Sequence, residues 1–319
     1  MAVPAGGATR ETAHYLTGRS RAKAGRTKRN IPLYLMFLPG ILFYLLFKYY
    51  PMGGIVIAFK DYNLYDGILN SPWVGFDNFR TLFNQPQTLN VIQNTLLLSV
   101  LGIAAGFPAP IALAVMLNEV RRMWFKKSVQ TLVYLPHFFS WVIVSGIVLE
   151  LFSQESGVIN HWIRQFAGEP YPFLYKPISW IMIFIGSGIW KEMGFAAIIY
   201  LAALTAIDPH LYESSAIDGA SKWQQIRHIS IPGIMPTIVL LLILNVGKVM
   251  DVGFDPVYML SNESVSEVSN VISYYNYTIG IQRAQFSLTT AMGLFENAVG
   301  FILVLGANYL ARRSNQSLW

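Results

Sequence analysis

The chain has 319 residues, of which 54% are hydrophobic and 13% are charged, against about 25% charged residues in an ordinary soluble domain. The mean hydropathy of +0.43 therefore indicates a membrane protein, and the absence of cysteine excludes disulfides, thiol catalysis and cysteine metal sites. The formal net charge of +6 does not indicate nucleic-acid binding, because the basic residues cluster at the ends of apolar segments, as membrane topology signals do.

Six apolar stretches are long enough to cross a bilayer, which takes about 20 mostly apolar residues per helix. They predict an all-α protein with six transmembrane helices, at Ile31–Phe59, Val91–Leu117, Val129–Phe152, Ile178–Leu204, Pro232–Met250 and Thr289–Leu310. The first stretch does not have the form of a cleavable signal peptide, because it is too long and is interrupted by Lys48 and Pro51. We expect residues 1–30 to form a basic arm and residues 31–319 to form the transmembrane domain.

The distribution of Lys and Arg predicts the orientation of these helices. Fifteen of the 23 basic residues lie in the N-terminal arm, in the second-to-third and fourth-to-fifth connections, and in the C-terminal tail. The connections on the opposite side contain only five. Because positive residues favour the cytoplasmic side of a membrane, we expect both termini to lie in the cytoplasm.

One cytoplasmic connection, residues 208–232, is polar and has strong helix signals. Asp208 followed by Pro209 is a typical helix start, with a capping side chain and then a proline at the first helical position. Gly219 suits a helix end. These signals predict two short helices joined by a bend at residues 218–220.

The second of these helices begins with a capping-box pattern, in which Ser221 is followed three residues later by Gln224. Its apolar residues Trp223, Ile226 and Ile229 fall on one stripe. A linker that rests on lipid headgroups is one interpretation of such a segment, but its acidic residues fit poorly against an anionic leaflet. A docking element for a cytoplasmic partner fits better.

The same connection resembles the cytoplasmic motif of the membrane subunits of ABC importers, EAAxxDGAxxxxxFxxIxLP. Here the motif begins as ESSAIDGA at Glu213 and ends as IRHISIP at Pro232, with serines for the two alanines, Ile226 for Phe and Ile231 for Leu. The stretches YLMFLPGILFYLLFKYYPM, WVGFDNF and GANYLARR are similar to the maltose-type sugar permease family. They resemble its branch for polysaccharide-derived oligosaccharides, one member of which takes up alginate oligosaccharides.

This resemblance implies the type I permease architecture of an ABC importer, in the bacterial inner membrane. It implies a second related permease, two cytoplasmic ATPase subunits and an extracytoplasmic sugar-binding protein as partners, besides the membrane lipid. ATP and magnesium would bind to the ATPases, and this chain would hold no cofactor. The motif residues that would couple the chain to an ATPase are Glu213, Ala216, Asp218, Gly219 and Ala220, with Glu213 as an electrostatic anchor and Gly219 as the tight turn.

Motifs of catalysis are missing from the sequence. It contains no GxxxxGK(S/T) phosphate-binding loop, no HExxH and no GxSxG. The five histidines are scattered without the spacing of metal ligands. We therefore expect no enzymatic activity and no metal site in this chain.

Polar side chains inside a membrane are costly and are candidates for a substrate pathway. The candidates are Trp190, Lys191, Glu192, Asn245, Lys248, Asp251, Glu296 and Asn297, and Trp190 is included because an aromatic ring suits the apolar face of a sugar. Helical spacing places Asn245, Lys248 and Asp251 close to one face. A purely structural interpretation stays open, in which Lys191 pairs with Glu192 and Lys248 pairs with Asp251. If one lysine is instead free to meet the substrate, we expect a sugar that carries carboxylates.

Two other functions suit a protein with several spans. A secondary transporter driven by an ion gradient often has inverted repeats and broken helices in matching positions, and the sequence reveals neither. A membrane scaffold without a transport role leaves the buried charges and the cytoplasmic motif unexplained. The preferred interpretation is a permease that forms the translocation pathway of an ATP-driven oligosaccharide importer.

Overall fold

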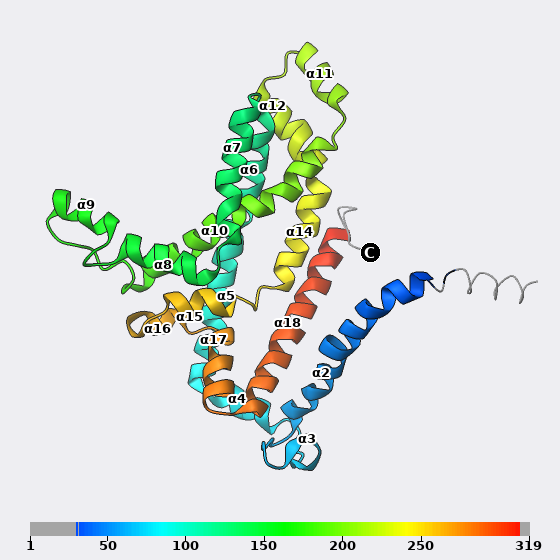
Figure 1. Ribbon diagram of the computed structural model, residues 1–319, viewed down its shortest axis with the longest axis vertical. Coiled ribbons are helices and arrows are strands. Elements are labelled where there is room, and N and C mark those ends of the chain that lie inside the picture. The colour runs from blue at the N-terminus through cyan, green and yellow to red at the C-terminus, as the bar shows by residue number, and fades with distance from the viewer. Residues whose placement is uncertain (1–29, 31, 313–319) are drawn as a thin grey trace, which may run out of the picture. The chain divides into compact units, whose positions relative to one another are not determined.

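The computed structural model describes residue 30 and residues 32–312 (Figure 1). Within these residues all regular secondary structure is helical, and the only β-type pairing is an isolated bridge between Lys60 and Trp73. The all-α prediction is confirmed. The predicted basic arm, residues 1–30, lies outside the described residues apart from Asn30.

The chain divides into two units, residues 1–56 and residues 57–319. The first unit contains most of an apolar helix, Pro32–Phe59, that is long enough to cross a membrane. This helix widens into a π-helical turn at Leu45–Tyr49, continues as α2 (Tyr50–Met52), and ends in the second unit as a 3-10 helix. Its large apolar side chains are mostly exposed, which suits a helix surrounded by lipid or by another subunit.

The second unit contains the remaining helices, which follow one another in the order shown in Figure 1. Their bounds are α3 (Gly67–Asn70), α4 (Asp77–Asn84), α5 (Pro86–Gly106), α6 (Pro108–Glu119), α7 (Met123–Tyr134), α8 (Trp141–Phe152), α9 (Val158–Ala167), α10 (Pro177–Thr205), α11 (Pro209–Ile217), α12 (Lys222–Gln225), α13 (Ile231–Gly233), α14 (Met235–Gly247), α15 (Phe254–Leu260), α16 (Ser266–Ser269), α17 (Ile272–Asn276) and α18 (Phe286–Arg312). Short 3-10 helices lie at Gly53–Phe59, Leu135–Phe138 and Glu263–Val265, and π-helical turns lie at Ile226–Ser230 and Tyr277–Gln282.

The described residues contain up to six membrane spans, in agreement with the predicted number. Four are single helices by length and composition, at Pro32–Phe59, Pro86–Glu119, Pro177–Thr205 and Phe286–Arg312. The other two are bent pairs: Met123–Phe138 and Trp141–Phe152 meet at 105°, and Lys222–Gly233 and Met235–Gly247 meet at 60°. The predicted spans at Val129–Phe152 and Pro232–Met250 therefore each contain a bend that the sequence analysis did not predict.

Both breaks occur beside prolines. Pro136, which has no backbone donor, lies at the end of the first half of the third span, and Phe139 after it is extended. In the fifth span Ile234 leaves the helical region (φ −97°, ψ 4°) two residues before Pro236. The sequence analysis did not predict these two breaks.

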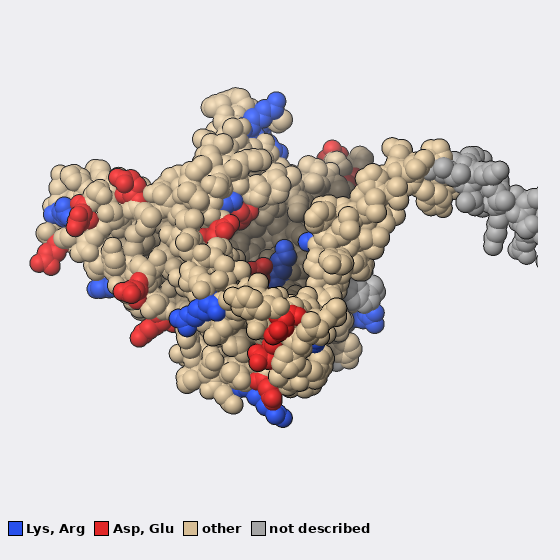
Figure 2. All heavy atoms as spheres, turned by 60° about the horizontal axis from the view of Figure 1, so that its bottom comes forward, with Lys and Arg blue, Asp and Glu red and all other residues tan. Residues whose placement is uncertain are grey.

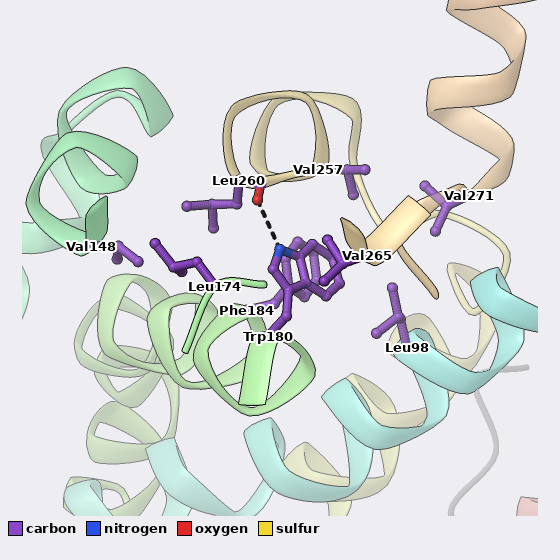
Figure 3. Packing of buried hydrophobic residues seen from close by; sticks show 9 residues of the cluster. All are labelled: Leu98, Val148, Leu174, Trp180, Phe184, Val257, Leu260, Val265 and Val271. Carbon is purple, nitrogen blue, oxygen red and sulfur yellow. Dashed lines mark hydrogen bonds between the residues drawn. The ribbon is translucent and has the colours of Figure 1, made fainter. Parts of the chain in front are cut away.

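A buried cluster joins α5, α8 and α10 to the long connection between α14 and α18 (Figure 3). Trp180 of α10 is 1% exposed, and its indole Nε1 donates a 2.8 Å hydrogen bond to the carbonyl of Leu260, where α15 ends. Phe184 stacks on Trp180 one turn later. Burial of each such side chain contributes about 1.5–3 kcal/mol, so this cluster fixes the long connection against the spans.

Close backbone contact holds α10 against α7. A Cβ atom added to Gly194 would overlap the carbonyl of Val133, so a glycine is needed at this crossing. Elsewhere the surface is poor in charge: on the face shown in Figure 2, Lys, Arg, Asp and Glu are few and scattered. Both features are those expected of helices that pack in a membrane.

Candidate substrate cavity and coupling segment

A cavity of about 470 Å³ lies in the second unit, between α5, α6 and α10 and the end of α14. Its wall is mostly apolar, and Trp141 and Tyr200 add aromatic surface. Four of the eight predicted pathway residues belong to the wall, namely Glu192, Asn245, Lys248 and Asp251. An apolar wall with a few polar groups is the usual composition of a ligand site.

Asn245, Lys248 and Asp251 are brought together by a turn at the end of α14. The helix ends at Gly247, before the predicted Met250. The backbone N–H of Lys248 donates to the Asn245 carbonyl (3.0 Å), and that of Asp251 donates to the Lys248 carbonyl (2.9 Å). The predicted proximity of the three residues is confirmed, but it comes from this turn and not from a continuing helix.

Lys248 is exposed in the cavity wall. Within the described part of the chain its ammonium has no ion pair, and the predicted alternative pairing with Asp251 does not form. Asp251 instead accepts a 2.9 Å hydrogen bond at Oδ1 from the backbone N–H of Gly253. The cavity therefore presents one cation that can meet a ligand.

Lys191 has the opposite environment. It is 7% exposed, and its Nζ donates to Glu192 Oε1 (2.9 Å) and to the backbone carbonyl of His137 (3.0 Å). The second Glu192 oxygen lies 2.8 Å from His137 Nδ1. His137 lies where the third span breaks, so its backbone carbonyl has no hydrogen-bond partner within the helix. The ammonium of Lys191 replaces that partner, and a positive charge at a helix C-terminus is favourable. The structural interpretation of the Lys191–Glu192 pair is confirmed, and Lys191 is not in the cavity wall.

The other candidate residues lie outside this wall. Trp190 lines a second, apolar cavity of about 540 Å³ between α8 and α10. Glu296 of α18 is partly buried. The Asn297 side chain donates to the carbonyl of Gly293, one turn earlier in the same helix. The structure thus brings four candidates to the cavity and leaves Trp190, Lys191, Glu296 and Asn297 outside its wall.

The cytoplasmic motif forms the two predicted helices. Asp208 caps α11 by accepting a hydrogen bond from the backbone N–H of His210, and Pro209 is the first helical residue. At the other end Gly219 has a φ of +81°, and its N–H donates to the carbonyl of Ala216 while that of Ala220 donates to Ser215. This pattern is a Schellman motif, which requires a left-handed residue and so explains the glycine.

The second helix also starts as predicted. Ser221 and Gln224 form both hydrogen bonds of a capping box at the start of α12. The predicted apolar stripe is only partly correct, because Ile226 and Ile229 are partly buried whereas Trp223 is 70% exposed. The helix widens to a π-helical turn at Ile226–Ser230, which shifts the residues after it relative to Trp223.

A polar network holds this motif to the spans. Gln225 is 4% exposed, and its amide donates to the carbonyl of Tyr212 (3.2 Å) and to Ser215 Oγ (3.0 Å). The Tyr212 hydroxyl bonds Ser230 Oγ at 3.0 Å. Lys222 forms a 3.2 Å ion pair with Glu119, the last residue of α6. The two short helices therefore form one body that is tied to the end of the second span.

The outer side of the motif is open. Glu213, Ala216, Asp218 and Gly219 are exposed and Ala220 is partly buried, while the apolar side chains of Leu211 and Ile217 are 51% and 87% exposed. The carboxylate of Glu213 lies 3.3 Å from Nδ1 of His210, one turn earlier in the same helix. Exposed apolar and acidic groups on one small surface are suited to contact with another protein.

The sequence analysis missed three residues that position these sites, namely His137, Gln225 and Glu119. A signal existed for His137, because Pro136 precedes it inside an apolar stretch and predicts a break. Gln225 and Glu119 have no such local signal, since their partners lie elsewhere in the chain.

Comparisons with known proteins agree with these features. Residues 96–316 match the family described as "Binding-protein-dependent transport system inner membrane component". The polygalacturonan/rhamnogalacturonan transport system permease protein YteP of Bacillus subtilis is 49% identical over 281 residues, 88% of each chain. Protein LplB of the same organism is 43% identical over 289 residues, 91% of each chain.

Solved structures give the same result. A chain in the crystal structure of a bacterial ABC transporter involved in the import of the acidic polysaccharide alginate has a TM-score of 0.84 and 43% identity, over 92% of this chain and 99% of that chain. A second structure of a bacterial alginate ABC transporter, in complex with an alginate pentasaccharide-bound periplasmic protein, matches equally well. Together with the motif at residues 213–232 and the four to six membrane spans, these matches show that the chain belongs to the family of inner membrane components of binding-protein-dependent transport systems and is a membrane permease of ABC importer type.

Proposed function

We propose that this permease forms one half of the translocation pathway of an ATP-driven importer for acidic oligosaccharides, in the inner membrane of a bacterium. The observation that carries this proposal is Lys248, whose ammonium is exposed in the wall of the cavity without an ion pair among the described residues. Relatives at 43–49% identity, by their names, transport polygalacturonan, rhamnogalacturonan or alginate, which are polymers with carboxylates.

The unpaired ammonium of Lys248 supports an acidic substrate, although the wall also contains the carboxylate of Asp251. Glu192 is already engaged by Lys191 and His137, so Lys248 is the cation left for a ligand in the wall. A carboxylate that binds an ammonium makes a charge-assisted hydrogen bond, which contributes about 1.5–3 kcal/mol. This free energy corresponds to an affinity about ten- to hundredfold higher. Asn245 and Asp251 are placed to bind sugar hydroxyls beside it.

The cytoplasmic motif supports coupling to an ATPase. In the importers that this chain resembles, the motif helix sits in a groove of the ATPase and moves with it. Here Glu213 and Asp218 would contact the ATPase, and the ion pair between Lys222 and Glu119 would pass the movement to α6. ATP and magnesium would be bound by two ATPase subunits.

The complete importer would contain further parts. A second, related permease would complete the pathway, and an extracytoplasmic binding protein would deliver the sugar, as the periplasmic protein does in the alginate transporter complex. The excess of basic residues in the arm, in the stretches at residues 121–127 and 222–227, and in the tail supports cytoplasmic termini.

Substrate-stimulated ATPase activity of the assembled importer tests the charge proposal. We expect acidic oligosaccharides to stimulate the wild type about ten- to hundredfold more effectively than carboxyl-reduced oligosaccharides of equal length. Lys248→Met should remove most of this preference, and Lys248→Arg, the matched control that keeps the charge, should retain much of it.

Two results would contradict the proposal in different ways. Equal stimulation of the wild type by both sugars would show that the importer does not select acidic substrates. A preference that survives Lys248→Met unchanged would move charge recognition to the binding protein or to the second permease.

A further inference from the structure

The helix α9 (Val158–Ala167) has an apolar face that no part of the described chain covers. Val158, Trp162 and Phe166 follow one another at intervals of four residues, and so share one face of the helix. They are 50%, 58% and 84% exposed. Ile159 and Ile163, on the flank of this face, are partly buried.

The side of α9 that packs against the protein is formed by Asn160 with the partly buried Ile159 and Ile163. Asn160 is completely buried, and its side chain bonds the backbone of Ser153 and of Tyr171, at 2.8–3.0 Å. Arg164 donates a 2.9 Å hydrogen bond to the carbonyl of Gln154. A helix on a water-soluble surface turns its large apolar side chains toward the core, whereas α9 leaves Val158, Trp162 and Phe166 exposed. The face formed by Val158, Trp162 and Phe166 is therefore exposed, while the hydrogen bonds of Asn160 and Arg164 hold α9 to the rest of the protein.

The position of α9 identifies what covers this surface. The helix begins six residues after Phe152, where one membrane span ends, and the next span begins at Pro177. It packs on α8, and both lie at the end of the same lateral arm in Figure 1. A helix so close to the ends of two spans lies at the level where lipid chains meet the headgroups.

The side chains around α9 have the chemistry of that level. Tyr171 follows in the same connection, and Lys176 lies over its ring, 4.5 Å from the centroid. Trp, Tyr and basic residues concentrate at membrane interfaces, where an apolar body meets lipid and a polar end meets water. The neighbouring spans also expose apolar side chains near this connection, Ile178 at 75% and Met182 at 62%, so the apolar surface continues from the spans toward α9.

We propose that α9 is an interfacial helix that lies on the lipid bilayer, with Val158, Trp162 and Phe166 inserted among the lipid chains. Asn160 and Arg164 fix its rotation, so that the bend of the third span and this helix together anchor the α8–α9 arm to the membrane surface. An amphipathic helix with Trp and Phe on one face and a basic residue on the other has the composition known for such helices.

The test uses nitroxide labels on introduced cysteines, because this chain has no cysteine of its own. The substitutions are Trp162→Cys and Phe166→Cys on the apolar face, with His161→Cys, also exposed, as the matched control on the polar side of the same helix. Each full-length variant is reconstituted with its partner subunits, made cysteine-free, in vesicles of phosphatidylethanolamine and phosphatidylglycerol. Collision of each label with oxygen, which concentrates in lipid, is compared with collision with a water-soluble nickel chelate.

We expect the frequency of collisions with oxygen to exceed that with the nickel chelate several-fold for labels at residues 162 and 166. For the label at residue 161 we expect collisions with the nickel chelate to be the more frequent. Labels at 162 and 166 that favour the nickel chelate would show that the face is in water, and would overturn the proposal. Labels at 162 and 166 that are shielded from both reagents would show that a protein subunit covers the face, and would also overturn it. If Phe166→Cys does not assemble, Val158→Cys reports on the same face.

Discussion

Two lysines, Lys191 and Lys248, show how the environment of a residue decides its role. Lys191 is buried and fully engaged by Glu192 and the His137 carbonyl, whereas Lys248 faces a cavity without an ion pair in the described part of the chain. Burial of an unpaired ammonium is expensive, so each lysine is stable only because its surroundings differ. Lys191 stabilises the break in the third span, and Lys248 is left for a ligand.

Replacement of Lys191 should therefore affect stability and not substrate choice. Lys191→Met removes two hydrogen bonds of a charged group, each of which contributes about 1.5–3 kcal/mol; because Glu192 is half-exposed, the total loss should lie near the lower end. We expect a lower midpoint of thermal unfolding in detergent and an unchanged ratio of ATPase stimulation by acidic and carboxyl-reduced sugars. A changed ratio with unchanged stability would instead place Lys191 in the substrate pathway.

The sequence predicted which polar residues are candidates for the cavity, but not which of these candidates lie in its wall. Polar residues in apolar spans stand out by their cost, and this signal identified four residues of the cavity wall but not Ser99, Trp141 or Tyr200. Which of them meet the cavity depends on the rotation of each helix and on side-chain partners such as His137, 54 residues away from Lys191. Trp190 and Lys191, adjacent in sequence, face different surroundings for this reason.

The coupling segment, residues 208–232, shows which features of a helical element the local sequence determines. The cap of α11, the Schellman motif at Gly219 and the capping box of α12 all involve residues within five positions of one another, so their patterns were sufficient to predict them. The bends in the third and fifth spans were missed because each joins two apolar helices, and apolar composition continues through the break.

The left-handed backbone of Gly219 makes it the most sensitive position of the coupling segment. Gly219→Val places a β-branched side chain at a φ of +81°, which costs about 1–2 kcal/mol or more. We expect loss of ATPase coupling or of assembly with the ATPase, measured by co-purification and by substrate-stimulated hydrolysis, while the binding protein still binds sugar. Gly219→Asn is the matched control, since Asn tolerates this conformation, and it should retain coupling. Wild-type transport by Gly219→Val would rule out the docking role.

The orientation of the permease in the membrane connects these elements to the two compartments. Cytoplasmic termini, which the distribution of basic residues predicts, would place the exposed surface of α11 toward an ATPase and the connection between α14 and α18 toward a binding protein. The fold class and the number of spans followed from the six apolar stretches, since the length of a span is set by the bilayer. The cavity could not be predicted in this way, because it depends on how helices from different parts of the chain pack together.

Labelling of single cysteines from outside the cell tests this orientation. Ser266 on α16 and Ser214 on α11 are both exposed serines, so Ser266→Cys and Ser214→Cys differ mainly in the side they occupy. We expect a membrane-impermeant maleimide to react with residue 266 in intact spheroplasts and with residue 214 only after permeabilisation. The reverse pattern would invert the topology and remove the basis for coupling at α11.

The proposed function is tested most directly by uptake into vesicles that contain this permease with its partner permease, ATPases and binding protein. We predict that labelled uronic-acid oligosaccharides accumulate only when ATP is enclosed on the ATPase side and the binding protein is present on the other side, and that carboxyl-reduced oligosaccharides of equal length accumulate about ten- to hundredfold less efficiently. Accumulation driven by a proton gradient without ATP would contradict the assignment as an ATP-driven importer, and equal accumulation of both sugars would contradict the acidic substrate.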